Sequence, residues 1–197
     1  VPRIEKLKVG PYTSGQDVAY GPVVTAAAKD NILNLVQTGV DQGATLVVDG
    51  RDFSLQGYED GFFVGPHLFD NVTPNMDIYT KEIFGPVLCT VRAGNYEEAL
   101  GLAMDHEYGN GTAIFTRDGD AARDFANRIN IGMVGINVPI PVPLAYHTFG
   151  GWKKSVFGDL NQHGPDAFKF YTRTKTVTAR WPSGIKQGGE FNFKAMD

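Results

Sequence analysis

The sequence predicts an α/β fold, a parallel sheet with helices on both faces, and a further strand near the carboxyl terminus. The main observation is that strand and helix patterns alternate through residues 87–137. Short apolar, β-branched runs predict strands at 87–91, 111–115 and 132–137, and two amphipathic stretches predict helices between them. Because a strand–helix–strand unit closes through a right-handed crossover, these strands are expected to be parallel.

The chain before this repeat divides into a lead-in, a helix and two strands. Residues 1–21 mix charges with Gly, Pro, Ser and Tyr without any period, so they are expected to be irregular. Pro22 suits the first turn of a helix and Gly39 suits its exit. Strands follow at 45–48 and, interrupted by a Gly-Pro pair, at 62–69. The helix is predicted to bury Val24, Ala28, Ile32, Leu35, Val36 and Val40.

Both helices of the alternating region begin at a capping residue. Asn95 with Glu98 makes a capping pair for the first, and Asp118 can cap the second. The predicted buried positions are Tyr96, Ala99, Leu100 and Ala103 in the first helix, and Ala122, Phe125, Ala126 and Ile129 in the second.

Two segments after the repeat are unusual. Residues 138–143 contain three prolines, so they must form an extended loop leaving the carboxyl end of the preceding strand, which is the ligand-binding side of a parallel sheet. Residues 168–181 alternate threonines with charged and aromatic residues, which predicts a long polar strand. Such a strand is either a blunted edge or an arm that pairs with another subunit, and we favour the arm. Residues 183–197 are expected to be a loose tail.

Composition limits the classes of function. The chain has 197 residues, 42% of them hydrophobic, and a net charge of −4, which argues against nucleic acid as the main partner. It contains no apolar run long enough to cross a bilayer and no signal peptide, and its one cysteine suggests a reducing compartment. We therefore expect a cytoplasmic protein that binds neither membrane nor nucleic acid.

The familiar catalytic motifs are missing. Cys89 lies within an apolar strand and is interpreted as a small core residue rather than a nucleophile. No metal site is predicted, because the four histidines share no metal-ligand spacing. Neither a phosphate-binding P-loop nor a dinucleotide-binding glycine motif is present. The chain therefore offers no catalytic residue of its own.

The most specific stretch is residues 80–92, with Glu82 and Phe84 directly before Gly85-Pro86. Proline fixes its own φ angle and pushes the preceding residue out of the helical region, so the chain turns here and enters a strand. A carboxylate and an aromatic ring are thereby held beside the end of a core strand, at the rim where open α/β sheets bind ligands.

These residues resemble the carboxyl-terminal portion of an aldehyde dehydrogenase. Residues 82–87 are similar to the Glu-x-Phe-Gly-Pro signature of that superfamily, and 108–115, 149–155 and 171–177 match further motifs in the same order. The stretches 135–143 and 157–159 most resemble the CoA-acylating methylmalonate-semialdehyde dehydrogenases, in a bacterial form. One departure is Val156, where many relatives have glycine.

The resemblance implies the following roles. Residues 22–167 would be part of a catalytic domain and 168–182 an oligomerisation strand, giving a homo-oligomer expected to be a tetramer. Glu82 would accept hydrogen bonds from the nicotinamide ribose of NAD, Phe84 would lie against the nicotinamide ring, and Phe149 would line the aldehyde channel.

The nucleophilic cysteine and the coenzyme domain of the family have no match here, so the partner would be the other half of the same polypeptide. The intact enzyme would convert a semialdehyde, CoA and NAD to an acyl-CoA, CO2 and NADH. The alternatives are a CoA-independent aldehyde dehydrogenase and a stand-alone, non-catalytic α/β binding module.

Overall fold

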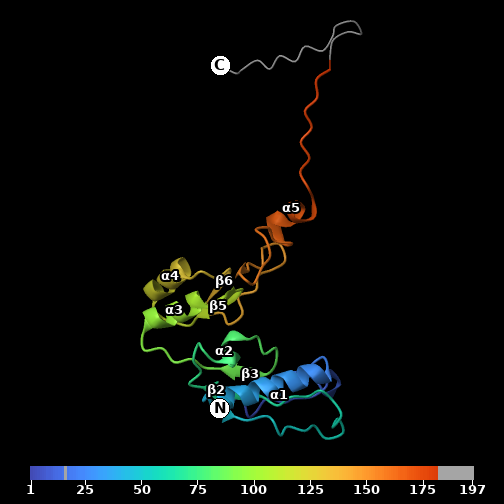
Figure 1. The fold of residues 1–197 in the computed structure, drawn as a ribbon, viewed down its shortest axis with the longest axis vertical. Helices are drawn as coiled ribbons and strands as arrows, with labels where there is room; N and C mark the ends of the chain where they lie inside the picture. Colours follow the sequence, from blue (N-terminus) through green and yellow to red (C-terminus); the bar gives the residue numbers. More distant parts are fainter. Residues whose placement is uncertain (16, 182–197) are drawn as a thin grey trace.

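The computed structural model describes residues 1–15 and 17–181 (Figure 1). Two layered bodies lie one above the other in this view, and a carboxyl-terminal segment extends away from them. The elements, in chain order, are η1 (Tyr12–Ser14), α1 (Ala26–Asp41), β1 (Thr45–Val48), β2 (His67–Asp70), α2 (Asp77–Thr80), β3 (Val87–Cys89), α3 (Tyr96–Asp105), β4 (Tyr108–Gly109), β5 (Gly111–Ile114), α4 (Gly119–Arg128), β6 (Met133–Ile136), β7 (Trp152–Lys153), η2 (Gly164–Asp166) and α5 (Ala167–Tyr171).

The first body is a three-stranded sheet in the order β1-β2-β3, with α1 and α2 packed against it. Strand β2 pairs antiparallel with β1 and parallel with β3. Phe69 and Val36 are fully buried where the sheet meets α1. The core comprises Leu35, Val36, Ala44, Phe69, Val72, Met76 and Ile78.

The second body is built on β5 and β6, which pair in parallel from Gly111–Met133 to Ile114–Ile136. Helices α3 and α4 pack together on this pair, with a core of Leu100, Phe125, Ile129 and Ile131 against Ile114 and Val134. A short antiparallel pair, β4 with β7, lies beside it.

This architecture confirms the predicted α/β class and most of the predicted elements. Both capping residues are confirmed: Asn95 accepts from Glu98 N at 2.9 Å, and Asp118 accepts from Asp120 N at 2.8 Å. In the alternating region, β5 and β6 form the predicted parallel pair, whereas β3 pairs with β2. The order of elements along the chain predicted strands at these positions, but it did not specify which strand would pair with β3.

Three local predictions were wrong. Helix α1 begins at Ala26 rather than Pro22, because the Thr25 side chain accepts a hydrogen bond from Ala28 N and caps it there. Val24 therefore lies outside the helix and is 80% exposed. Ala99 and Ala126 were predicted to be buried but are exposed. The buried face of each helix is narrower than predicted and is centred on Leu100 in α3 and on Phe125 in α4.

The strand predicted at 168–182 is not confirmed. Residues Ala167–Tyr171 form helix α5, and the Thr172 hydroxyl donates to the Phe168 carbonyl at its end. From Thr172 to Trp181 every residue is exposed and no strand is assigned, and this segment runs away from both bodies in Figure 1. A strand needs a ladder partner, and none of the strands in the described residues pairs with this segment. Residue 182 and the tail predicted at 183–197 lie outside the described residues.

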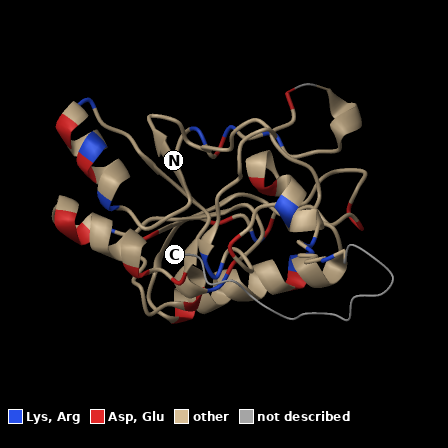
Figure 2. Cartoon of the chain, turned by 90° about the horizontal axis from the view of Figure 1, so that it is seen from above, with Lys and Arg blue, Asp and Glu red and all other residues tan. Residues whose placement is uncertain are grey.

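Charges of both signs are interspersed over the described helices and loops, without one continuous basic face (Figure 2). No helix among the described residues is both long and apolar enough to cross a membrane.

Candidate functional site

The candidate site begins at the loop between α2 and β3. Helix α2 is one turn long, and its start is fixed by Asp77 N, which donates to the Gln42 side chain at 2.8 Å. At its end Lys81 Nζ lies 2.6 Å from the Asp77 carboxylate, and this hydrogen bond lowers the pKa of Asp77. Glu82 follows directly and is exposed.

The turn after Glu82 packs closely against α1 and is hydrogen-bonded to β2. A Cβ atom at Gly85 would lie 2.6 Å from Ile32 Cδ1 of α1, so only glycine allows the loop to rest on that helix. The Pro86 carbonyl accepts from His67 N at 2.9 Å, which joins the turn to β2. The turn is therefore held on two sides by the first body.

Phe84 stands out from this turn in an unusual conformation. Its φ angle is +55°, in the left-handed region that L-residues other than Asn and Asp rarely occupy, and 79% of the residue is exposed. Burial does not explain this conformation. A strained backbone that presents an apolar ring to solvent is typical of a binding site.

The position predicted for the Glu82 loop within the sheet was wrong. The Glu82 loop enters β3, so it lies at the amino end of that strand, whereas the rule for open α/β sheets concerns carboxyl ends. The case for a site therefore depends on the exposure of the two side chains and on the pocket beside them.

Glu82 lines a pocket of about 510 Å³ between the two bodies. One wall comes from the end of α2 and the loop after it, and the other comes from the segment around β4 and the residues after β7. The lining residues are Tyr79, Thr80, Lys81, Glu82, His106, Tyr108, Asn110, Lys154 and Ser155.

Sequence reasoning assigned no role to this second wall. Tyr108, Asn110, Lys154 and Ser155 lie in stretches that matched family motifs, and that match was the available signal. His106 gave no signal, because its partner Tyr79 is remote in sequence. The wall is held by Ser155 Oγ, which accepts from Gly109 N at 3.0 Å.

The two lysines after β7 have structural partners. Lys153 Nζ donates to the carbonyls of Met104 and His106 at 2.6 and 2.9 Å, so a cation caps the carboxyl end of α3. Lys154 is ion-paired with Glu107, and that hydrogen bond raises the pKa of Lys154.

Phe149 lies in a neighbouring pocket of about 280 Å³ rather than in the Glu82 pocket. Its ring packs on His163 with centroids 4.4 Å apart. The two pockets share Asn110 and Ser155, so the predicted channel residue and the predicted coenzyme residue lie on either side of one wall. The channel role of Phe149 stays a prediction.

The proline-rich loop folds back over β6. Asn137 turns the chain with a φ angle of +58° and pairs its side-chain amide with Thr116 N and O at 2.9 and 3.0 Å. A Cβ atom at Gly135 would lie 2.4 Å from the Val138 carbonyl, so the close return of the loop requires glycine there.

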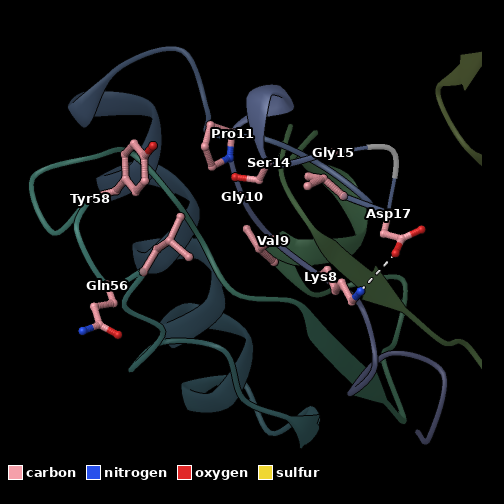
Figure 3. A pocket seen from close by; sticks show the side chains of 11 residues that line it. Lys8, Val9, Gly10, Pro11, Ser14, Gly15, Asp17, Gln56 and Tyr58 are labelled. Carbon is pink, nitrogen blue, oxygen red and sulfur yellow. Dashed lines mark hydrogen bonds and ion pairs between the residues drawn. The ribbon is translucent and has the colours of Figure 1, made fainter.

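A further pocket, of about 590 Å³, lies in the lead-in and is shown in Figure 3. Its charged groups are Lys8 and Asp17, which are exposed and pair with each other at 3.2 Å. Tyr58 and Gln56 contribute to the lining from the loop after β1. This arrangement presents no group with evident chemistry.

Cys89 behaves as a packing residue, as predicted. It is half-buried against the first core, its Sγ lies 3.7 Å from the Ile78 carbonyl, and burial raises the pKa of the thiol. In the part of the chain that the structure describes, no cluster of three or more His, Cys, Asp or Glu side chains could hold a metal ion.

Comparison with known proteins identifies the family to which this chain belongs. A model of the aldehyde dehydrogenase family matches residues 1–177. The chain belongs to the aldehyde dehydrogenase family, which confirms the resemblance found in its motifs.

Particular relatives lie within one branch of the family. The chain is 57% identical to malonate-semialdehyde dehydrogenase of Pseudomonas aeruginosa over 198 residues, covering 100% of this chain and 39% of the relative. Among solved structures it is similar to a putative methylmalonate-semialdehyde dehydrogenase of Sinorhizobium meliloti in complex with NAD, with 70% identity and a TM-score of 0.86.

That match covers 94% of this chain and 38% of the solved one. The methylmalonate-semialdehyde dehydrogenase of Oceanimonas doudoroffii gives 54% identity and a TM-score of 0.85, covering 93% of this chain and 37% of the other. The chain thus spans less than half the length of these relatives.

Proposed function

We propose that this chain is the carboxyl-terminal catalytic-domain portion of an NAD-dependent, CoA-acylating methylmalonate- or malonate-semialdehyde dehydrogenase, working with an upstream part of the same polypeptide. The observation that carries the proposal is the exposed pair of Glu82 and Phe84 on a rigid turn beside a pocket. The names of the relatives support this reading, and one of them was solved with NAD.

The residues present fit a nicotinamide ribose. The Glu82 carboxylate is an acceptor with two oxygens on an exposed loop, which matches a diol with two hydroxyl donors. The Phe84 ring is free to cover a planar group, because 79% of the residue is exposed. NAD would supply the acceptor for the hydride of the aldehyde.

Both residues would act by orientation. Fixing the ribose and one face of the nicotinamide places the reacting carbon, an effect of positioning rather than of proton transfer. The thiolate that attacks the semialdehyde would come from the upstream part, since Cys89 is a packing residue. The overall reaction would yield propionyl- or acetyl-CoA, CO2 and NADH from semialdehyde, CoA and NAD.

We further propose a cytoplasmic homo-oligomer, a tetramer, assembled through residues 168–182. Support comes from the exposure of Thr172–Trp181, a segment rich in β-branched residues of the kind found in strands that pair with another subunit. Deleting residues 172–197 should then lower the oligomeric state in sedimentation. An unchanged oligomer would contradict the role of the segment.

The test of the activity uses the full-length polypeptide that contains this chain. We expect NADH formation from malonate semialdehyde to depend on CoA, and CoA-independent NADH formation would favour the other dehydrogenase class. An open reading frame without an upstream cysteine-bearing part would favour a stand-alone binding module.

The test of the site uses Glu82→Gln. Loss of charge-assisted hydrogen bonds, worth roughly 1.5–3 kcal/mol, should raise the Kd for NAD about 10- to 100-fold. Glu5→Gln, which removes an exposed carboxylate in the lead-in, serves as control and should leave it unchanged. Equal NAD affinity in the two variants would contradict the proposed role of Glu82.

A further inference from the structure

Tyr79 joins the two bodies at the edge of the Glu82 pocket. It lies in the single turn of α2, and its hydroxyl donates to the Leu102 carbonyl of α3 at 3.1 Å. Its own carbonyl lies 3.3 Å from His106 Nε2. The side-chain hydroxyl and the main-chain carbonyl of Tyr79 are thus bonded to Leu102 in α3 and to His106 directly after it.

His106 is held in the orientation that this contact needs. Its Nδ1 accepts from Tyr108 N at 3.2 Å, so a neutral ring carries its proton on Nε2 and donates it to the Tyr79 carbonyl. The ring packs against Tyr79 and Tyr108, with centroids 5.2 and 6.0 Å away. Lys153 Nζ fixes the His106 carbonyl at 2.9 Å.

This cluster lies where it can set the shape of the pocket. Tyr79 and His106 line the pocket from opposite walls, and Glu82 follows Tyr79 by less than one helical turn. Helix α2 has four residues, too few to be rigid by itself. The two bodies have separate cores, so contacts at their junction determine the distance between the walls.

Resting on the function proposed above, we propose that Tyr79 and His106 form a clasp that positions the Glu82 carboxylate for the nicotinamide ribose. Both are positioning residues and act through Glu82. The clasp fixes the loop of residues 80–86 against the wall formed by Tyr108, Asn110 and Ser155.

The test is NAD binding in the full-length polypeptide carrying Tyr79→Phe, which removes the hydroxyl that bonds to Leu102 and keeps the ring. We expect the Kd for NAD to rise about three- to tenfold, as for loss of one neutral hydrogen bond, with a smaller change in kcat. The matched control is Tyr96→Phe, which removes a tyrosine hydroxyl bonded to Asp124 at 2.8 Å between α3 and α4. It should change the Kd less than about twofold.

Coupling to Glu82 separates positioning from a general structural role. In the Glu82→Gln background, Tyr79→Phe should produce no further loss of NAD affinity, because the group it positions is already altered. His106→Leu should give the same pattern, as a second variant that removes the donor to Tyr79. Equal losses with and without Glu82→Gln would overturn the clasp.

Hydrogen exchange gives a readout that does not depend on activity. Amides of residues 80–85 should exchange faster in Tyr79→Phe than in Tyr96→Phe, and equal rates would overturn the inference. If Glu82→Gln weakens NAD binding and Tyr79→Phe does not, only the clasp is wrong. If Glu82→Gln has no effect, the proposed function of that residue is wrong, and the clasp is overturned with it.

Discussion

At position 84 we expect glycine to give a more stable protein than alanine. At an ordinary helical position the order is reversed. We consider two truncations, Phe84→Gly and Phe84→Ala. Both remove a ring that is largely exposed, so both lose little burial. They differ in the left-handed conformation at φ +55°, which glycine adopts freely and alanine does not.

The magnitude follows from two opposing terms. Left-handed backbone costs an L-residue roughly 1–2 kcal/mol, and glycine avoids this cost. Glycine also loses more backbone entropy on folding, by roughly 0.5–1 kcal/mol relative to alanine. The glycine variant should therefore be more stable than the alanine variant by up to about 1.5 kcal/mol, or up to about 3–6 °C in Tm for a chain of this size.

The assay is thermal and urea unfolding of both variants followed by circular dichroism. Ala99→Gly in α3, at an exposed helical position, provides the control, and there glycine should be less stable than alanine by about 1 kcal/mol. If the glycine variant at position 84 is less stable than the alanine variant, as at position 99, the backbone is not left-handed there.

The two variants should differ in stability but not in their affinity for NAD. Both truncations remove the surface proposed to lie against nicotinamide, so both should weaken NAD binding in the full-length polypeptide by a similar factor. A gain in stability in Phe84→Gly together with a loss of NAD binding is expected where backbone strain serves function.

Three further predictions concern the supports of the site. Burial lowers the pKa of His67, whose residue is 1% exposed, so the folded form stays neutral while the unfolded form takes up a proton near pH 6.5. The free energy of unfolding should then fall as pH falls below about 6.5, by at most about 1.4 kcal/mol per pH unit. In His67→Phe, the free energy of unfolding measured with urea should change less between about pH 5 and 6.5 than in the parent chain. Gly85→Ala should destabilise the chain by roughly 1–3 kcal/mol in the same assay, because its Cβ would lie 2.6 Å from Ile32, and an unchanged midpoint would contradict this packing. Cys89 should react slowly with a thiol reagent in the folded chain and rapidly in urea, because burial raises the pKa of its thiol, and rapid labelling of the folded chain would contradict its role in packing.

Several features of the fold were accessible from sequence because their causes are local. The cap at Asn95 and the cap at Asp118 each involve a side chain and backbone within one turn. The turn at Gly85-Pro86 follows from the restricted φ of proline. The parallel pairing of β5 and β6 follows from the crossover between them, which has one allowed hand.

Two other features were predicted wrongly, the first for a local reason and the second for want of a long-range partner. The start of α1 was misplaced because Pro22 is a permissive signal, whereas the Thr25 cap determines where the helix begins. Residues 168–171 were assigned to a strand from their β-branched surroundings, yet a strand without a partner has no ladder, and a short helix forms instead.

The sequence by itself determined the α/β class, the family, and the identity of the pair Glu82 and Phe84 on a rigid turn. Only the tertiary structure decided that this turn lies at the amino end of β3, that Phe84 is left-handed, and that Tyr79 and His106 close the pocket edge. The physical reason is the separation along the chain of the residues that interact. Turns, caps and hydrophobic periods are set by neighbours within a few residues, whereas a pocket wall depends on how two separately packed cores meet.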